Sequence, residues 1–568
     1  MTLEKVVDPK DDTEKVILSN FASGATGNLV LIDPVTGEGE SLPLPGDEGG
    51  EGLLNLDNEK LLVGTASAFG YLHVLELRNR TWRKPLRDPD NNYIWNMCLG
   101  SDGMVYGGTY PGCALLRYDM ARHELENLGR VSDDPANLYS RFVYGGIPGY
   151  ILIDCMSNSQ HLSLWSIDAR QARRFGKPGA KLKEITSEFI CTQTNGTLDF
   201  YDPHTFEELP GDLASRLTPP VPVPVRGASS PVKFNDGSLV GYRGQEYFYL
   251  RTKGTKPEIR PVPTERPATG IHTIISDPNG KIWGCSNFGQ TIFSFDPASG
   301  KVWNSQVVCD NAGEVYGMAF AGGKLFMAAY AGGDHIVYDP ETSWDQMNNV
   351  NPRTLEPVSP RLIRPSGRSV IGPDGNFWTG WMAKYGVYGG GLSCVDTRTL
   401  KVSSWYDPVP KQAIGGLTAD DRYLYFVTNG DSNGLPEGSG PFHFVVWDAN
   451  GKIVRDISLA ADEKPGSVLA LGERVVLRMD RPGGLRIFNP NRLEFEANIP
   501  FPEGPRTMAP MGADRLAVFT NSRLAFVNPK TREVTFDCDL PSHVHSATIT
   551  PDGVIYFAAE LNLYRLTS

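Results

Sequence analysis

The chain has 568 residues, with 54 basic and 66 acidic side chains and a formal net charge of −12. Glycine (61) and proline (43) supply many turns but stay below the content of low-complexity chains, and an aromatic fraction of 10% can build large cores. These numbers exclude a disordered or collagen-like chain. An acidic chain without a basic block also lacks the electrostatic footprint of a nucleic-acid binder, so we expect no nucleic-acid partner.

The cysteines, the N-terminus and the hydropathy indicate the cellular compartment and the kinds of partner to expect. The 8 cysteines form no C-x-x-C pair and lie mostly in apolar runs, which predicts buried free thiols and no metal site. No window of the chain approaches the length of an apolar membrane span, so no membrane partner is expected. The N-terminus is charged and lacks the apolar stretch of a secretory signal; with Met1 as the natural start, a cytoplasmic location follows.

A repeat of roughly 40–50 residues is the most informative signal, because such periods are typical of propellers and solenoids. One recurring piece is a β-branched or aromatic run that ends in Asp-Pro and Thr/Ser-Gly, as in residues 31–37, 200–203, 295–300 and 338–342. A second piece is a tight turn between two strands, at Asp102-Gly103, Asn279-Gly280, Asp374-Gly375 and Asp552-Gly553. Both pieces are typical of hairpins, since Asp and Asn bond their own backbone and Gly supplies positive φ.

Each repeat therefore predicts four short antiparallel strands, and no segment shows a sustained helical period. The predicted fold class is all-β, a large β-propeller of about 11–12 four-stranded blades. Units are expected at residues 52–85, 93–131, 141–176, 181–209, 229–263, 271–306, 315–350, 368–408, 414–457, 468–500 and 507–541, with 545–568 completed by 28–45.

The predicted blades can be arranged in two ways, as one ring or as two propellers. Because the two ends look complementary, we favour one ring that spans residues 1–568. Two propellers in tandem are the alternative. The proline-rich stretches 209–230 and 351–366 are candidate linkers between them, or long connections between neighbouring blades.

Functional residues are expected at the face where the loops of all blades converge on the central channel, because loops carry function while strands carry packing. The longest aromatic loop is expected at residues 378–391. Near the axis, where first strands begin, we place Tyr93, Trp95, Arg141, His272, Tyr316, Arg368 and His545.

In length and architecture the chain resembles the fungal propeller hetero-Diels–Alderases of tropolone–sesquiterpene biosynthesis. The resemblance implies a cofactor-free enzyme that adds a tropolone o-quinone methide to a humulene-type alkene, both largely apolar small molecules. A cycloaddition needs orientation and polarisation instead of a nucleophile. For the polar, catalytic roles we name His272, Tyr330, His335, Arg368 and Lys384. For substrate binding we name Tyr110, Trp381, Tyr385, Tyr388, Tyr316 and His545.

Two alternatives stay open, and the first is a polysaccharide lyase or glycosidase that acts on uronate- or rhamnose-containing glycans. Residues 105–112 resemble blade segments of propeller polysaccharide lyases, including rhamnose–glucuronate lyases. That resemblance implies an Arg that neutralises a uronate carboxylate and a His or Tyr that removes the C5 proton, from the pool Arg141, Arg368, His272, Tyr316 and Tyr330. The other alternative is a non-enzymatic interaction scaffold. A deep aromatic pocket favours the first function, an open Arg/His cleft the second, and a filled channel the third; the oligomeric state is left open.

Overall fold

The computed structural model describes residues 2–66, 69–311, 313–366, 368–501 and 503–566. Within these ranges the chain is almost entirely β, and the one helix is the short 3-10 helix η1 (Ala214–Arg216). Over the same residues, no helix is both apolar and long enough to cross a bilayer. The chain divides into two compact units, Met1–Ala268 and Thr269–Ser568.

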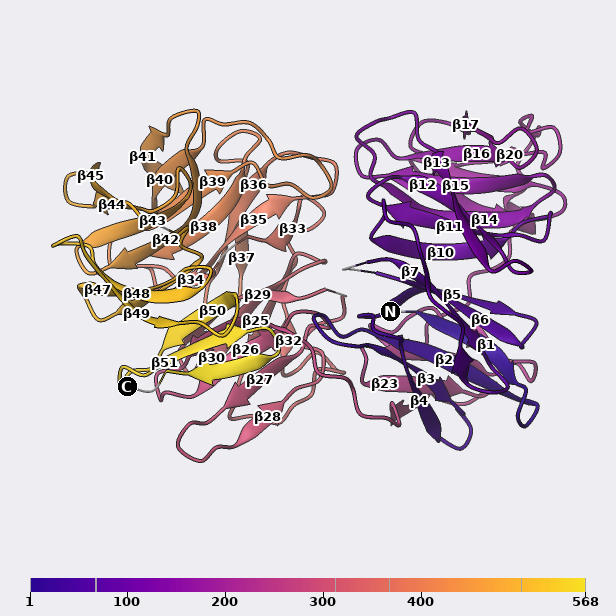
Figure 1. The fold of residues 1–568 in the computed structure, drawn as a ribbon, viewed down its shortest axis with the longest axis horizontal. Helices are drawn as coiled ribbons and strands as arrows, with labels where there is room; N and C mark the ends of the chain where they lie inside the picture. Colours follow the sequence, from indigo (N-terminus) through magenta and orange to yellow (C-terminus); the bar gives the residue numbers. More distant parts are fainter. Residues whose placement is uncertain (1, 67–68, 312, 367, 502, 567–568) are drawn as a thin grey trace. The chain divides into compact units, whose positions relative to one another are not determined.

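The first unit holds six antiparallel sheets among its described residues. In chain order they are β1 (Leu3–Asp8), β2 (Thr13–Asn20), β3 (Asn28–Ile32), β4 (Gly39–Pro43); β5 (Gly50–Leu56), β6 (Lys60–Thr65), β7 (Tyr71–Glu76), β8 (Thr81–Trp82), β9 (Leu86–Arg87); β10 (Tyr93–Leu99), β11 (Val105–Tyr110), β12 (Ala114–Asp119), β13 (Glu124–Arg130); β14 (Tyr139–Ile147), β15 (Tyr150–Met156), β16 (His161–Ser166), β17 (Gln171–Phe175); β18 (Lys181–Ile185), β19 (Ile190–Thr194), β20 (Thr197–Tyr201); β21 (Val232–Lys233), β22 (Leu239–Arg243), β23 (Tyr247–Arg251), β24 (Glu258–Pro261) (Figure 1).

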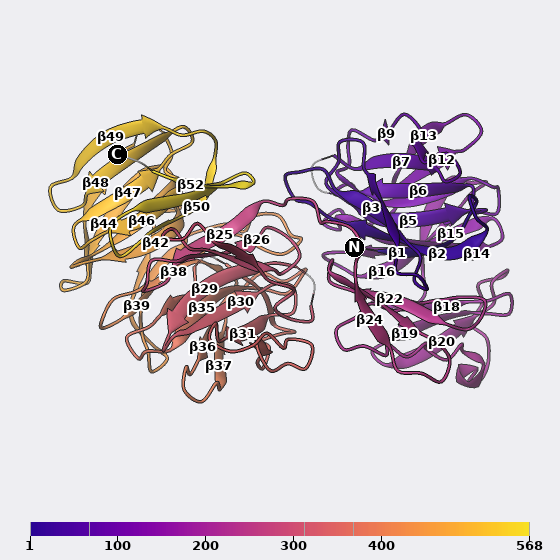
Figure 2. The ribbon, with the colours of Figure 1, turned by 90° about the horizontal axis from the view of Figure 1, so that it is seen from below.

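The second unit holds seven such sheets among its described residues. They are β25 (Ile271–Ser276), β26 (Ile282–Ser286), β27 (Ile292–Phe295), β28 (Val302–Asn304); β29 (Val315–Ala321), β30 (Lys324–Ala329), β31 (Asp334–Tyr338), β32 (Arg353–Thr354); β33 (Leu362–Pro365), β34 (Val370–Ile371), β35 (Phe377–Ala383), β36 (Gly390–Val395), β37 (Val402–Tyr406); β38 (Ala413–Ala419), β39 (Leu424–Asn429), β40 (His443–Asp448), β41 (Lys452–Ser458); β42 (Lys464–Leu471), β43 (Arg474–Arg481), β44 (Leu485–Asn489), β45 (Glu494–Ile499); β46 (Thr507–Met511), β47 (Arg515–Phe519), β48 (Arg523–Asn528), β49 (Glu533–Asp539); β50 (Val544–Ile549), β51 (Ile555–Ala559), β52 (Asn562–Arg565). Figure 2 lets the sheets be followed from β25 through β29, β38, β42 and β46 to β50.

Each unit closes on itself, because its last sheet packs against its first. In the first unit β1 contacts β21, and a core that includes Val16, Val30 and Phe248 fills the space between the two sheets. In the second unit β25 contacts β50 and β51, with Ile274 and Tyr556 in the shared core. The closures use side-chain packing, since among the described residues neither ring shares a strand between its first and last sheets.

The β-propeller class is therefore confirmed, and the chain adopts the tandem arrangement instead of the favoured single ring over 1–568. Residues 28–45 do not complete the C-terminal sheet, which remains three-stranded. The reason is an unexpected hairpin: residues 3–8 pair with 13–20 and give β3 and β4 a sheet of their own. Neither predicted linker joins the units, since 209–230 connects β20 to β21 and 351–366 contains β32 and β33.

The predicted turns form as their chemistry requires. The Asp33 carboxylate accepts hydrogen bonds from the backbone N–H groups of Val35 and Thr36 at 2.8 and 3.1 Å. Gly37 then adopts φ of +80°, which only glycine reaches without strain. The Asp-Gly turns behave alike, with Gly103 at +78° and Gly375 at +74°. All 8 cysteines are free thiols, as the apolar runs around them predict.

Candidate active site

A cavity of about 210 Å³ lies in the second unit. Most of its lining residues lie near the start of the first strand of a sheet (β25, β29, β38, β42, β46 and β50), and we call these first strands the inner strands. The charged lining groups of the cavity are all cationic, and no Asp or Glu is among the described residues that line it. Its charged and titratable lining side chains are His272, Tyr316, Arg368, Arg478, Arg506 and His545. This composition is unusual for a chain of net charge −12, and it gives the cavity a positive potential.

Arg368 contributes the most isolated of these charges. It follows β33, and its Nη2 donates a hydrogen bond to the Ala547 carbonyl at 3.2 Å. It has no ion-pair partner among the described residues, and burial lowers the pKa of its guanidinium. A buried cation without a counter-charge is costly to fold, so this arginine fits a site that receives an anion from outside.

Arg478 and Arg506 are the other two arginines of the cavity, and they contact each other. Arg478 Nη1 donates to the Arg506 carbonyl at 2.6 Å, and Arg478 Nη2 lies 3.1 Å from the half-exposed Asp480. Arg506 Nε donates to Asn521 at 2.7 Å. Asp480 therefore offsets one of the three arginine charges, and a net positive charge remains for a ligand.

Gly466 gives Arg478 its access to the cavity. Arg478 lies on β43, the second strand of its sheet, while Gly466 lies on the inner strand β42. A Cβ atom on Gly466 would collide with Arg478 Nη2 and with Asp480 Oδ1. The missing side chain on the inner strand is therefore what lets an arginine from the next strand reach the channel.

His272 and Tyr316 stand side by side on the wall of the cavity, with ring centroids 4.3 Å apart. Burial, then His545 and Arg364, lower the pKa of His272 to about 4, so its imidazole is neutral at pH 7. Its Nδ1 atom is buried and has no hydrogen-bond partner among the described residues. Burial raises the pKa of Tyr316 to about 12, so its phenol keeps its proton. The pair thus joins a proton acceptor to a proton donor.

A second polar cluster adjoins Tyr316. The Arg364 guanidinium lies 4.1 Å from the ring centroid of Tyr330, whose hydroxyl is 2.7 Å from that of Tyr385. Burial raises the pKa of Glu314 to about 7, against the lowering effect of Arg364, and one Glu314 carboxyl oxygen has no partner among the described residues. This cluster combines phenol, guanidinium and carboxyl groups that suit sugar hydroxyls.

The channel continues past Arg368. A further cavity of about 190 Å³ is lined by Tyr316 and Arg368 and by more apolar residues such as Ile275, Met318 and Val370. Arg368 and Tyr316 are among the side chains that line both cavities, so they lie where the two spaces adjoin.

The structure brings four of the predicted residues around one cavity: His272, Tyr316, Arg368 and His545. Tyr330 and Tyr385 meet each other in the adjoining cluster. Lys384 is exposed, and the hydroxyl of Tyr388 donates to the Pro436 carbonyl at 3.0 Å. The roles of all these residues stay predictions.

His335 and Trp381 are a correction, because neither lines the cavity. Both are fully buried, and His335 Nε2 and Trp381 Nε1 share the hydroxyl of Ser393 at 2.8 and 2.7 Å. The expected loop 378–391 is shorter than predicted, since β35 extends to Ala383 and carries Trp381 into the core. Burial lowers the pKa of His335 to about 4, as for a neutral core histidine.

The remaining predicted residues belong to the first unit, where they pack on one another. Trp95 stacks on Tyr93 with centroids 4.7 Å apart, and Tyr110 stacks on Tyr139 at 4.6 Å. The Arg141 guanidinium lies 4.4 Å from the Trp95 ring centroid. Tyr93, Trp95 and Arg141 lie near the starts of the first strands β10 and β14, whereas Tyr110 ends β11. These groups satisfy each other by stacking and cation–π contacts.

Sequence reasoning missed Arg478, Arg506, Glu314 and Arg364. Arg506 directly precedes an inner strand, as Arg368 precedes β34, and the same positional rule would have found it. Arg478 had a weaker signal, an inner-strand glycine opposite an arginine on the following strand.

No protein-family model matches the chain, and no curated protein matches it. Among solved structures it is similar to Kuenenia stuttgartiensis hydrazine synthase, with 15% identity over 56% of this chain and 99% of that chain and a TM-score of 0.43. It is also similar to an inactive Staphylococcus aureus virginiamycin B lyase with quinupristin (14% identity, 52% and 93% covered, TM-score 0.41). The extracellular domain of the putative one-component system BT4673 of B. thetaiotaomicron is 13% identical (98% and 79% covered, TM-score 0.37). These similarities assign neither a family nor an activity.

Proposed function

We propose that the second unit is a lyase that cleaves uronate-containing glycans by β-elimination in its central channel. The observation that carries the proposal is the cavity of about 210 Å³, which three arginines and two histidines line without any carboxylate among its described lining residues. The volume is below the roughly 300–1,000 Å³ of sites for drug-sized ligands, and it suits one sugar ring with its carboxylate.

Arg368 is the group that binds the substrate carboxylate in this proposal. It lacks an acidic partner among the described residues, and an Arg–carboxylate pair gains two parallel hydrogen bonds in a desolvated site. Neutralising the carboxylate also makes the proton on the adjacent carbon, C5, more acidic. Removal of this proton is the step that limits elimination from a uronate.

His272 is the proposed base and Tyr316 the proposed acid. The neutral imidazole removes the C5 proton, the C–H electron pair forms the C4–C5 double bond, and the C4–O bond breaks. The leaving oxygen takes the phenolic proton of Tyr316, whose high pKa keeps that proton available. A bound carboxylate also raises the pKa of His272 from about 4, because an opposite charge favours the imidazolium, and so strengthens the base.

The test is turnover of oligosaccharides that place glucuronate next to rhamnose, followed by ultraviolet absorbance of the unsaturated product. The matched control is the carboxyl-reduced oligosaccharide, which has the same shape and no charge. We expect product from the acidic substrate alone and none with His272→Gln or Tyr316→Phe. Equal turnover by wild type and His272→Gln would contradict the assignment of the base.

The cycloaddition that the first resemblance implies stays a prediction, since two residues named for it, His335 and Trp381, lie in the core. It is tested by incubating the protein with a humulene-type alkene and a quinone-methide precursor. A chiral adduct in that reaction, with no product from uronates, would replace the lyase proposal.

A further inference from the structure

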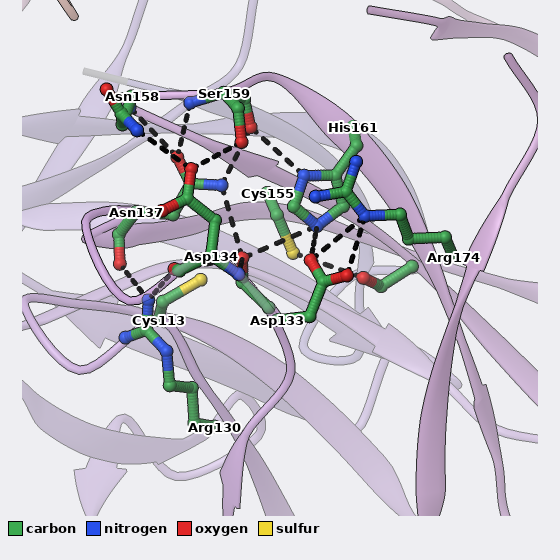
Figure 3. A network of polar contacts seen from close by, with 12 residues as sticks. Cys113, Arg130, Asp133, Asp134, Asn137, Cys155, Asn158, Ser159, His161 and Arg174 are labelled. Carbon is green, nitrogen blue, oxygen red and sulfur yellow. Dashed lines mark hydrogen bonds and ion pairs between the residues drawn. The ribbon is translucent and has the colours of Figure 1, made fainter. Parts of the chain in front are cut away.

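A buried pair of thiols in the first unit lies beside a network of polar contacts that reaches the largely exposed Asp133 (Figure 3). Cys113 lies between β11 and β12, and Cys155 lies on β15 of the next sheet. Both side chains are fully buried and belong to one core cluster. Neither residue takes part in the proposed lyase site.

Strand register places the two cysteines and His161 together. Cys155 pairs with Ser140 on one side and with His161 on the other, so these three side chains share a face of the sheet. The Cys113 thiol donates to the carbonyl of Tyr139, the neighbour of Ser140, at 3.2 Å. The two thiols lie in one buried cluster and contact each other through a side-chain hydrogen bond.

The imidazole of His161 neighbours Cys155 across the strand pair, and the Cys155 thiol donates to the Ser163 hydroxyl at 3.6 Å. The imidazole Nδ1 donates to the Ser159 carbonyl at 3.0 Å, which leaves Nε2 as the acceptor, and the Ser132 hydroxyl lies 3.4 Å from Nε2. Nε2 lies 3.7 Å from an oxygen of Asp133, and the Asp133 carboxylate accepts two hydrogen bonds from Arg174 Nε at 2.8 and 2.9 Å (Figure 3). Asp133 is largely exposed, so a proton taken by His161 has a short path to solvent.

The protonation preferences within the pair are asymmetric. A hydrogen bond from Cys155 lowers the pKa of Cys113, although burial opposes this effect, whereas the same contact and burial raise the pKa of Cys155. The Cys155 contact also raises the pKa of His161. Cys113 is the better nucleophile and Cys155 the resolving thiol, because the thiolate is the form that reacts.

We propose that Cys113 and Cys155 form a peroxide-oxidisable pair that closes to a disulfide between two neighbouring sheets of the first unit. The Cys113 thiolate attacks one peroxide oxygen, the O–O bond breaks, and with one proton a sulfenic acid and water result. The Cys155 sulfur then attacks the Cys113 sulfur while its proton passes to His161. The S–O bond breaks, and the leaving hydroxide takes the proton from His161 and becomes water. Two thiols are oxidised by two electrons, and one hydrogen peroxide is reduced to two waters.

The link would brace the turn that carries Cys113, which adopts a positive φ of +49°. A cross-link between two sheets restricts the unfolded chain more than the folded one. Because both thiols are buried, oxidation proceeds through local opening of this turn and is slow compared with that of an exposed thiol.

The full chain is treated with hydrogen peroxide, its remaining thiols are alkylated under denaturing conditions, and its peptides are identified by mass spectrometry. We expect a Cys113–Cys155 peptide, and a rise of roughly 5–10 °C in the melting temperature of the first unit. Cys113→Ser and Cys155→Ala should abolish the cross-link. Cys98→Ser, which changes a partly buried thiol of the same cluster, should leave it intact.

His161→Gln separates a relay from simple proximity. We expect it to slow cross-link formation by about tenfold or more at pH 7, with a smaller difference at pH 9, where hydroxide replaces the base. Eight alkylated thiols after treatment, a cross-link through Cys98, or an unchanged rate in His161→Gln would overturn the proposal. The wild-type peptide map decides the outcome even where a variant fails to fold.

Discussion

The imidazole of His272 and the phenol of Tyr316 lie 4.3 Å apart, centroid to centroid, on the inner strands of two neighbouring sheets. Burial moves their pKa values in opposite directions, to about 4 and about 12. At neutral pH one ring therefore accepts a proton while the other donates one. This complementarity, beside an arginine without an acidic partner among the described residues, is the basis of the proposed elimination.

Replacing Arg368 separates function from stability. In Arg368→Met we expect kcat/KM on glucuronate oligosaccharides to fall by about 100-fold or more, because a charge-assisted pair is lost from a desolvated site. Its stability should stay equal or rise, since the substitution removes a buried charge that has no counter-ion among the described residues. The control is Arg398→Met, an exposed turn residue of the same unit. A destabilised Arg368→Met with normal kcat/KM would show that this arginine is structural.

The low pKa of His272 predicts how stability depends on pH. The folded form stays neutral down to about pH 4, whereas the unfolded histidine protonates near pH 6.5, so the unfolded state binds more protons between these values. The stabilisation is present above pH 6.5 and is lost as the pH falls toward 4. His272→Gln removes this slope, and its free energy of unfolding relative to wild type should change by on the order of 3 kcal/mol across the window.

Urea unfolding at several pH values between 4 and 7, with wild type and His272→Gln side by side, measures this difference. The comparison cancels other titrating groups, such as Glu314, whose raised pKa of about 7 acts in the opposite sense. Parallel curves for the two proteins would mean that His272 titrates normally, and that the channel is wetter than its burial indicates.

Trp381→Ala tests whether that residue is core or site. Trp381 is fully buried, bonds Ser393 and contacts His335 edge-on at 5.3 Å. Truncation should cost about 3–5 kcal/mol of stability and leave kcat per folded molecule unchanged. Trp381→Phe should cost less, because most of the volume is kept. A large loss of kcat at intact stability would return Trp381 to the site.

The two closed rings predict independent folding. Residues 1–268 and 269–568, produced separately, should each show native circular dichroism and a cooperative thermal transition, because each unit has its own closing core. The second unit alone should keep the activity on uronates. Aggregation of both halves, with a folded full-length chain, would contradict this expectation.

The repeat could be predicted from the sequence because its turns need particular residues. Asp33 and Gly37 mark a hairpin by backbone chemistry alone, and eleven predicted units correspond to sheets of the structure. The closure of each ring could not be predicted from the sequence. Closure depends on packing between sheets distant in sequence, such as the core cluster that holds both Val16 and Phe248. It also depends on a first hairpin whose charged residues made its strands hard to recognise.

Placement near the axis was predictable at His272 and Arg368, since their position relative to an inner strand follows from the repeat. Burial was not predictable, and it decided the outcome at His335 and Trp381. An aromatic residue at the end of a strand has the same local pattern whether it faces a channel or the neighbouring sheet. Only the three-dimensional contacts distinguish the two cases.

The most direct test of the central claim is calorimetric titration of the full chain with glucuronate and, as the uncharged match, with glucose. We predict saturable 1:1 binding of glucuronate that weakens with added salt, no detectable binding of glucose, and loss of glucuronate binding in Arg368→Met but not in Arg398→Met. Equal binding of the two sugars, or glucuronate binding that survives Arg368→Met, would contradict a carboxylate site in the channel.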